Sequence, residues 1–246
     1  MMYRDLLAAA AACVAGTLAL AAAPTHPDDL AASVQAYVTA YGQSDLHRTI
    51  VSNRGNGPPE LEGLRNLRTV LPGILYRAGA NNAYRTAEVL PNQGPLPPEA
   101  LQNLCQQGFS DAIYLYSRRF TASTITCQRH GAGNQLRYSK ANPYMSVATT
   151  RGILKLVHDR IEGADHRPVL VHCWNGWHAS GYQAAIALRQ FCGFSAQRGV
   201  KYWDENAAPL GKPETAAVHA AIANFVPLPE LQISRAHRDL LCPKTP

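Results

Sequence analysis

Acidic residues are scarce in this sequence, whose 246 residues include 17 Asp and Glu against 23 Lys and Arg. The formal net charge of +6 indicates a surface that attracts anions, such as phosphate esters, anionic lipids, polysaccharides or nucleic acids. A basic surface that serves only solubility is the alternative. No acidic residue occurs between Asp111 and Asp159, which excludes a carboxylic acid of that stretch as a proton donor in catalysis.

Other absences narrow the class of protein. The lack of a Lys/Arg-rich run with interleaved aromatic residues argues against nucleic-acid binding. No internal repeat is visible, and a content of 46% hydrophobic and 16% charged residues suits one globular domain with a sizeable core. His172, Cys173 and His178 lack the spacing of a zinc site. We therefore predict neither a metal nor a cofactor.

The N-terminus has the pattern of a secretory signal. Arg4 precedes an uncharged stretch rich in alanine and leucine at residues 6–23, and Ala19-Leu20-Ala21 fits the small-x-small rule for signal-peptidase cleavage. We predict a signal peptide at residues 1–21 and a secreted or periplasmic protein. A retained membrane anchor is the alternative, but the stretch is short and alanine-rich for a stable membrane span.

The most informative segment is residues 168–181, PVLVHCWNGWHASG. An apolar run of strand length ends at His172-Cys173, and a helical pattern resumes at Ser180 after a short loop. If Gly176 has a positive φ, successive N–H groups can point into one concavity, to which the N-terminus of the helix adds positive charge. Such a loop binds anions and stabilises the thiolate of Cys173. The alternative is a purely structural loop with Cys173 as a small buried hydrophobe.

His172-Cys173, Gly176 and Ser180-Gly181 resemble the signature of the cysteine-dependent protein tyrosine and dual-specificity phosphatases. In that family, His-Cys is followed by five residues, an arginine, Ser or Thr, and often Gly. The resemblance implies that Cys173 is the nucleophile and that Ser180 helps the thiolate to leave. It also implies that the phosphate is bound by the residues after the cysteine, namely Trp174, Asn175, Gly176, Trp177, His178, Ala179, Ser180 and Gly181.

Ala179 stands where this family has its arginine. Alanine cannot supply the planar, bidentate grip on two phosphate oxygens, and the loss of such a donor typically costs about 3 kcal/mol. Arg77, Arg118 and Arg129 are candidates to replace it. The family's general acid is an aspartate on a loop between strands, for which residues 139–143 offer only Asn142.

His178 offers a replacement for the missing groups, because Gly176-Trp177-His178 resembles the Gly-Trp-Asp of some inositol-lipid phosphatases. An imidazolium there could supply positive charge and a proton. The alternative is that His178 only hydrogen-bonds the backbone. An acidic spot at residues 203–206, WDEN, could also reach the site; surface capping is its ordinary role.

Residues 64–79 carry a second resemblance, to the opening of the atypical dual-specificity phosphatases. There an Asn-Phe-Arg segment leads through a tight turn to Leu-Tyr-Arg-Ser-Gly; here Leu67 and Ala78 replace the phenylalanine and serine. Two short strands joined at Pro72-Gly73 fit the local pattern. The two matches define a phosphatase-like domain at residues 63–225, preceded by an N-terminal helix and linker at 22–62 and followed by a surface tail at 226–246.

Helical and strand patterns alternate along this domain. We expect a helix at residues 30–40, a loop or flexible arm at 44–62, a helix ending near 107, a strand at 111–116, and helices at 148–162, 195–202 and 213–225, the last of the chain. This alternation predicts an α/β fold with a mainly parallel central sheet and helices on both faces.

Removal of the leader takes away Cys13 and leaves Cys105, Cys127, Cys173, Cys192 and Cys242. Cysteines tend to pair in an oxidising compartment, and an odd number leaves one free, which we expect to be Cys173. The other four allow three pairings. We favour Cys105 with Cys127 and Cys192 with Cys242.

We therefore expect an exported phosphatase-like protein that acts on, or binds, a phosphate ester at the Cys173 loop, with weak or lost catalysis. A non-catalytic module that binds an anionic ligand or a protein partner is the main alternative. A rhodanese-like sulfurtransferase is the third, although the rhodanese loop lacks the His-Cys and Ser-Gly flanks.

Overall fold

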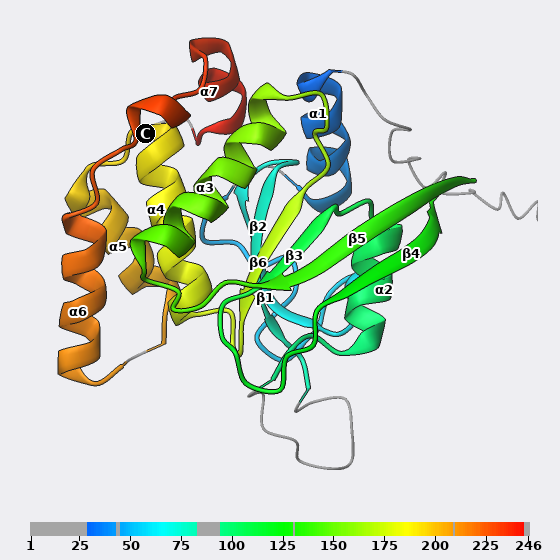
Figure 1. The fold of residues 1–246 in the computed structure, drawn as a ribbon, viewed down its shortest axis with the longest axis horizontal. Coiled ribbons are helices and arrows are strands. Elements are labelled where there is room, and N and C mark those ends of the chain that lie inside the picture. Colours follow the sequence, from blue (N-terminus) through cyan, green and yellow to red (C-terminus); the bar gives the residue numbers. More distant parts are fainter. Residues whose placement is uncertain (1–28, 43–44, 83–93, 130, 209, 244–246) are drawn as a thin grey trace, which may run out of the picture.

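The computed structural model describes residues 29–42, 45–82, 94–129, 131–208 and 210–243. Within these residues the chain forms a single six-stranded sheet with the order β1-β2-β6-β3-β5-β4, surrounded by helices (Figure 1). The strands are β1 Leu64–Leu71, β2 Leu75–Ala80, β3 Asp111–Tyr114, β4 Ser123–Arg129, β5 Ala132–Lys140 and β6 Val169–Cys173. The helices are α1 Leu30–Tyr41, α2 Pro98–Gln106, α3 Val147–Glu162, α4 His178–Cys192, α5 Ala196–Asn206, α6 Lys212–Ala223 and α7 Arg235–Leu241, with short 3-10 turns at Pro59–Leu61 and Pro229–Leu231.

The sheet is mixed, with a parallel centre. β6 pairs in parallel with β2 and with β3, and β3 pairs in parallel with β5. The two outer pairs, β1 with β2 and β4 with β5, are antiparallel hairpins. The predicted α/β fold class is therefore confirmed. Because parallel strands end at the same edge of a sheet, the ends of β2, β6, β3 and β5 meet there, and the loop from β6 to α4 leaves from this edge.

Helices cover both faces of the sheet, as predicted. Alternate residues of β6 divide between two apolar clusters, with Val169, Val171 and Cys173 facing the side of α3 and α4. Leu170 faces the other side, where α2 packs. A strand that is buried on both faces is apolar at nearly every position, which explains why β6 was recognisable as an uninterrupted run.

The β4–β5 hairpin was not predicted from the sequence, in which these residues form a basic, polar stretch. β4 is an edge strand with mostly exposed side chains, so it has no apolar face to detect. β5 buries Asn134, Leu136 and Tyr138 in alternation, and this period of two was the available signal. The first buried position is an asparagine, which weakens that pattern.

Two terminal segments are more integrated than we expected. Residues 45–62 form loops and one 3-10 turn, but Leu46, Val51 and Leu61 are buried, so the segment is packed against the domain rather than forming a surface arm. The tail also contributes Leu231, Ile233 and Leu241 to the core and forms α7. The prediction that the helix ending near residue 225 is the last one was wrong. The predicted signal peptide lies outside the described residues.

Both favoured disulfides are present, Cys105–Cys127 between α2 and β4 and Cys192–Cys242 between the end of α4 and the tail. Cys173 is free, as predicted. Such cross-links stabilise a fold mainly by restricting the unfolded chain, by about 2–4 kcal/mol each. In the described part of the chain, no helix is long and apolar enough to cross a membrane.

Candidate functional site

The thiol of Cys173 lies at the end of β6, beside the first turn of α4. Its sulfur is 3.4 Å from the hydroxyl oxygen of Ser180, and both side chains are buried. β6 is buried along its whole length, and Ser180 is the third residue of α4, so two packed elements fix these groups. The structure thus brings together the predicted nucleophile and the hydroxyl predicted to assist its departure.

Gly176 has a φ of +74°, the conformation on which the predicted anion loop depends. A Cβ at this position would lie 2.7 Å from the backbone nitrogen of Gly79 and 2.8 Å from the carbonyl carbon of Ala78. Gly79 is just as restricted, since a Cβ there would lie 2.4 Å from the carbonyl carbon of Asn175. Both the backbone angle and the close approach to β2 therefore require glycine in the loop.

The carbonyl groups of the loop are held by donors on β1 and β2. The Ala80 N–H donates to the Trp174 carbonyl at 3.1 Å, and the side-chain amide of Asn66 donates to the Asn175 carbonyl at 2.7 Å. Arg77 donates from Nη1 to the carbonyls of Gly176, at 2.9 Å, and Trp177, at 3.4 Å. The sheet thereby fixes the orientation of consecutive peptide groups.

This orientation leaves several amides available. In a trans peptide the N–H points opposite to the C=O, so the N–H groups of Trp177 and His178 face away from Arg77. The first-turn amides of α4, at His178, Ala179 and Ser180, have no partner within the helix, and Trp177 provides no side-chain cap. These amides and the helix dipole form a positive environment beside the Cys173 sulfur, suited to a thiolate or a bound oxyanion.

Ala179 is fully buried in the apolar cluster that contains Cys173. The position of the family's arginine is thus part of the core here. Gly181, by contrast, makes room for another arginine, because a Cβ there would lie 3.0 Å from the Arg77 Nη1.

The three candidate replacement arginines lie in different places. Arg77 is fully buried, and its guanidinium donates to the Gly176 and Trp177 carbonyls of the loop. Arg129 ends β4 opposite Ala132, at the far edge of the sheet, with its guanidinium over the Tyr37 ring. Arg118 is exposed, follows β3 at the site edge and is close enough for its charge to act on Tyr114. Arg118 is therefore the candidate that lies on the correct edge.

His178 is tied to the backbone. Its Nε2 donates to the Ala208 carbonyl at 2.8 Å, and its own carbonyl accepts from the Trp203 indole at 3.1 Å. These contacts direct the ring toward the connection between α5 and α6. They favour the alternative in which His178 is structural.

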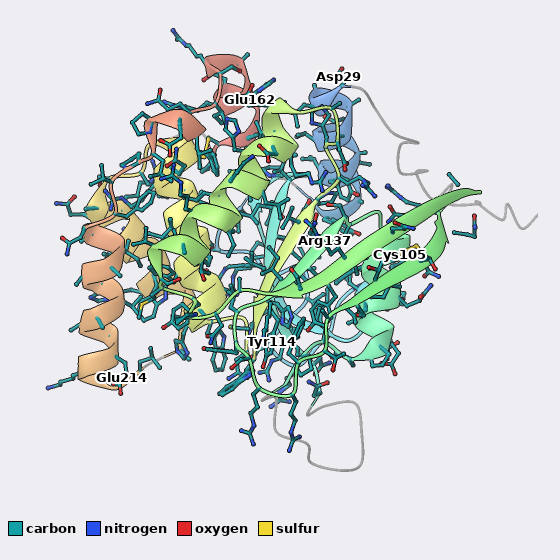
Figure 2. The ribbon with its side chains drawn as sticks, viewed as in Figure 1. Asp29, Cys105, Tyr114, Arg137, Glu162 and Glu214 are labelled. Carbon is teal, nitrogen blue, oxygen red and sulfur yellow. A yellow bond between two sulfur atoms is a disulfide. The ribbon has the colours of Figure 1, made fainter. Side chains whose placement is uncertain are left out.

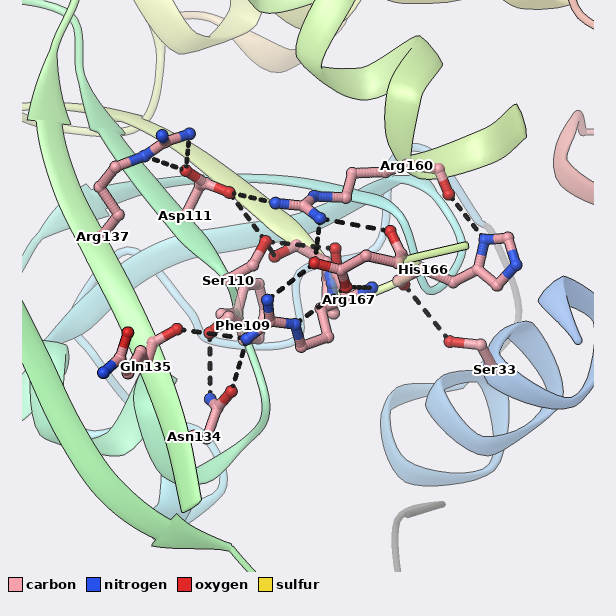
Figure 3. Close-up of polar contacts among 12 residues, drawn as sticks. Ser33, Phe109, Ser110, Asp111, Asn134, Gln135, Arg137, Arg160, His166 and Arg167 are labelled. Atoms are coloured by element: carbon pink, nitrogen blue, oxygen red, sulfur yellow. Dashed lines mark hydrogen bonds and ion pairs between the residues drawn. The ribbon is translucent and has the colours of Figure 1, made fainter. Parts of the chain in front are cut away.

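The predicted acidic residues are engaged elsewhere. Asp204 pairs with His219 at 2.7 Å and Glu205 with His47 at 3.7 Å. Asp111 lies at the start of β3, opposite Val169, about 13 Å along the strand direction from the level of Cys173. Figure 3 shows its carboxylate between the guanidinium groups of Arg137 and Arg160, which makes it a structural ion pair.

Asn142, the residue considered in place of the family's aspartate, lies in the connection between β5 and α3. It lines a separate cavity of about 410 Å³ between β5 and α3, together with Ser139, Lys140 and Thr149.

His172 supports the strand end. Nδ1 of His172 lies 3.3 Å from the Cys173 carbonyl, which can only accept, so Nδ1 carries the ring proton and donates it. Nε2 of the neutral ring then accepts from the Tyr138 hydroxyl, 2.9 Å away, which itself accepts from the Leu96 N–H. Burial lowers the pKa of His172 to about 3, so the ring is neutral at physiological pH.

An aromatic wall, formed by Tyr114, Tyr116, Tyr144 and Trp174, lies next to the thiol. The Trp174 indole donates to the Tyr114 hydroxyl at 2.7 Å, and Tyr116 packs against both Trp174 and Tyr144. Burial and then the negative charge of a Cys173 thiolate raise the pKa values of Tyr116 and Tyr144. Figure 2 shows Tyr114 at the lower edge of the sheet, the edge at which β6 ends.

This aromatic wall was not predicted from the sequence. Tyr114 and Tyr116 stood in a predicted strand, and their spacing was the available signal. The wall places aromatic rings beside the Cys173 thiol.

No protein-family model matches this chain, and no curated protein matches it in sequence. Within the described residues, no group of three or more His, Cys, Asp or Glu side chains is arranged to hold a metal ion.

Proposed function

We propose that this protein is an exported, cysteine phosphatase-like protein that binds a phosphate ester or a related oxyanion at the Cys173 loop, with weak or lost turnover. The observation that carries the proposal is the 3.4 Å contact between the Cys173 sulfur and the Ser180 hydroxyl at the uncapped start of α4. A thiol, an assisting hydroxyl and free helix-terminal amides are what a thiol-dependent phosphoryl transfer uses.

The reaction assigned to these groups has two steps. The Cys173 thiolate attacks phosphorus, forming an S–P bond while the P–O bond to the leaving group breaks, and the leaving oxygen takes up a proton. Water then attacks the phosphocysteine, loses a proton, and releases phosphate and the thiolate, to which Ser180 donates a hydrogen bond. The negative charge on the phosphoryl oxygens must be stabilised by a cation or hydrogen-bond donors, and the charge on the leaving oxygen by a proton donor.

Two partners are missing from this arrangement. Ala179 supplies no cation, and the missing donor typically lowers the rate by about 10²- to 10³-fold. No carboxylic acid occurs between Asp111 and Asp159, and a general acid contributes about 10²- to 10⁴-fold. Both deficits support weak turnover. They also keep open the second candidate, a non-catalytic module whose loop holds an anionic ligand or a partner.

Export is part of this proposal. The two disulfides are compatible with an oxidising compartment, and they support the signal peptide proposed for residues 1–21. Mass spectrometry of the mature protein should find an N-terminus near Ala22. A mature chain that begins at Met1 or Met2 contradicts the proposed leader.

Hydrolysis of an aryl phosphate tests turnover, since an aryl leaving group needs little protonation. We expect slow hydrolysis by the wild-type protein and none by Cys173→Ser, with orthovanadate inhibiting. Ser195→Ala, which removes a hydroxyl that caps α5, is the control variant outside the Cys173 loop and should hydrolyse the aryl phosphate at the wild-type rate. Brisk hydrolysis would show that a cation and an acid act here that the proposal lacks. Equal rates in wild type and Cys173→Ser would remove Cys173 from the reaction.

A further inference from the structure

Two arginines face each other on the reverse side of the Cys173 loop. Arg68 of β1 and Arg77 of β2 are register partners across the hairpin, and Tyr202 of α5 packs on the same face, with its ring centre 5.5 Å from the Arg77 guanidinium carbon. Like charges placed directly opposite each other in an antiparallel pair destabilise it. Such a pair is compatible with a stable fold where a negatively charged group compensates the two positive charges.

These two side chains also have unsatisfied donors. The Nε and Nη1 of Arg68 and the Nε of Arg77 are inaccessible to solvent and have no hydrogen-bond partner. The Tyr202 hydroxyl is in the same state. Arg77 is fully buried and Tyr202 is 2% exposed, so the donors lie inside the fold. Buried charged donors without partners cost more than neutral ones, and native folds contain few of them.

No acid compensates this charge from within the chain's described part. Burial first and the Arg77 charge second lower the pKa of Arg68 to about 10, with Tyr202 acting in the opposite direction. The nearby carboxylate of α5, Glu205, is directed to His47 and Lys201 instead. The arrangement is therefore a positive, donor-rich position without an internal anion.

We propose that Arg68, Arg77 and the Tyr202 hydroxyl form a second oxyanion site behind the Cys173 loop, and that its ligand is hydrogen phosphate or a phosphate group of the same chemistry. Two guanidinium groups and a hydroxyl match the several acceptor oxygens of this anion. Arg68 is only partly buried, which provides the route from solvent. This site differs from the proposed phosphate ester site and does not depend on chemistry at Cys173.

A neighbouring acceptor favours phosphate over sulfate. The side-chain oxygen of Asn206 is buried without a partner, and the backbone carbonyl of the same residue accepts from Arg77 at 3.4 Å. An acceptor at this place matches the P–OH of hydrogen phosphate, which sulfate lacks at neutral pH. Because Arg77 also holds the Gly176 and Trp177 carbonyls, occupation of the second site fixes the arginine that shapes the Cys173 loop.

Calorimetric titration of the full mature chain with inorganic phosphate, and separately with sulfate, tests this proposal. Arg68→Met removes the guanidinium and keeps an apolar stem of similar length. Arg235→Met on α7 is the matched control, since its side chain is 95% exposed. Cys173→Asp, or carbamidomethylation of Cys173 if that variant does not fold, blocks the loop site instead.

We expect two phosphate-binding sites in the wild type and in Arg235→Met. The block at Cys173 should remove one of them, and the other should survive that block and weaken by about tenfold or more in Arg68→Met. Sulfate should bind less tightly than phosphate. Phosphate should also raise the melting temperature of the wild type more than that of Arg68→Met. Binding that Arg68→Met leaves unaltered, or no binding at all, overturns the second site. Binding lost only when Cys173 is blocked supports the loop site alone, and binding lost only in Arg68→Met supports the second site while contradicting the proposed function.

Discussion

Arg77 and Gly176 are 99 residues apart in the chain, yet the guanidinium Nη1 of one donates to the carbonyl of the other at 2.9 Å. The same nitrogen lies 3.4 Å from the Trp177 carbonyl. A side chain of β2 thus determines how the peptide groups before α4 are turned. The anion-binding capacity assigned to the Cys173 loop depends on this contact.

Arg77→Met should disrupt the loop and the fold together. It leaves two carbonyls without their charged donor and should lower the free energy of unfolding by about 2–4 kcal/mol. Urea denaturation measures this loss, and the rate of iodoacetamide alkylation of Cys173 reports on the loop. Arg235→Met should change neither quantity. If Arg77→Met matches the wild type in both, the loop does not depend on Arg77.

Gly176→Ala should be more harmful than an alanine at another glycine of similar backbone conformation. Gly193 has a φ of +68° and no atom within 4 Å of an added Cβ, so Gly193→Ala should cost about 1 kcal/mol through backbone strain alone. Gly176→Ala adds the clash with the backbone of β2 and should cost about 1–3 kcal/mol more. Thermal or urea unfolding compares the two variants. Equal losses would show that the loop does not press on β2.

Ala179→Arg should not restore the family's phosphate grip. The alanine is fully buried, so an arginine overpacks the core and should destabilise the protein by about 1–3 kcal/mol or more. Ala148→Arg is a matched control, because Ala148 is also the second residue of a helix but is exposed. A stable Ala179→Arg variant with faster aryl phosphate hydrolysis would contradict the buried position described here.

Stability should depend on the protonation of His172. Its folded pKa of about 3 lies below the value near 6.5 of an unfolded chain. Above about pH 6.5 the ring is neutral in both states, and below it the unfolded state binds the proton more readily. Stability should therefore fall by about 1.4 kcal/mol for each pH unit below 6.5, toward pH 3. The slope of unfolding free energy against pH should be smaller in His172→Gln; an unchanged slope excludes His172 as its source.

Part of this structure could be predicted from the sequence because the signals were local. The apolar run of β6 and the position of Gly176 located the strand and the loop, while α4 begins at His178, two residues before the predicted Ser180. Counting the cysteines that follow the predicted leader isolated Cys173. These features depend on composition and on short-range geometry, which a single sequence contains.

The remaining features depend on contacts between distant segments. The edge strand β4 has exposed side chains and gives no burial pattern. The opposition of Arg68 and Arg77 follows from the register of β1 on β2, which a bulge shifts. The attachment of His178 to Ala208 requires the placement of the segment after α5. None of these is visible before the elements are packed.

Crystals soaked with tungstate should show whether the Cys173 loop binds an oxyanion, because tungsten is located in an anomalous difference map. We expect a tungstate ion with the Cys173 sulfur on one side and the amides of Trp177, His178, Ala179 and Ser180 as its donors. Tungstate density elsewhere in the crystal, with none at this loop, would refute oxyanion binding by the loop.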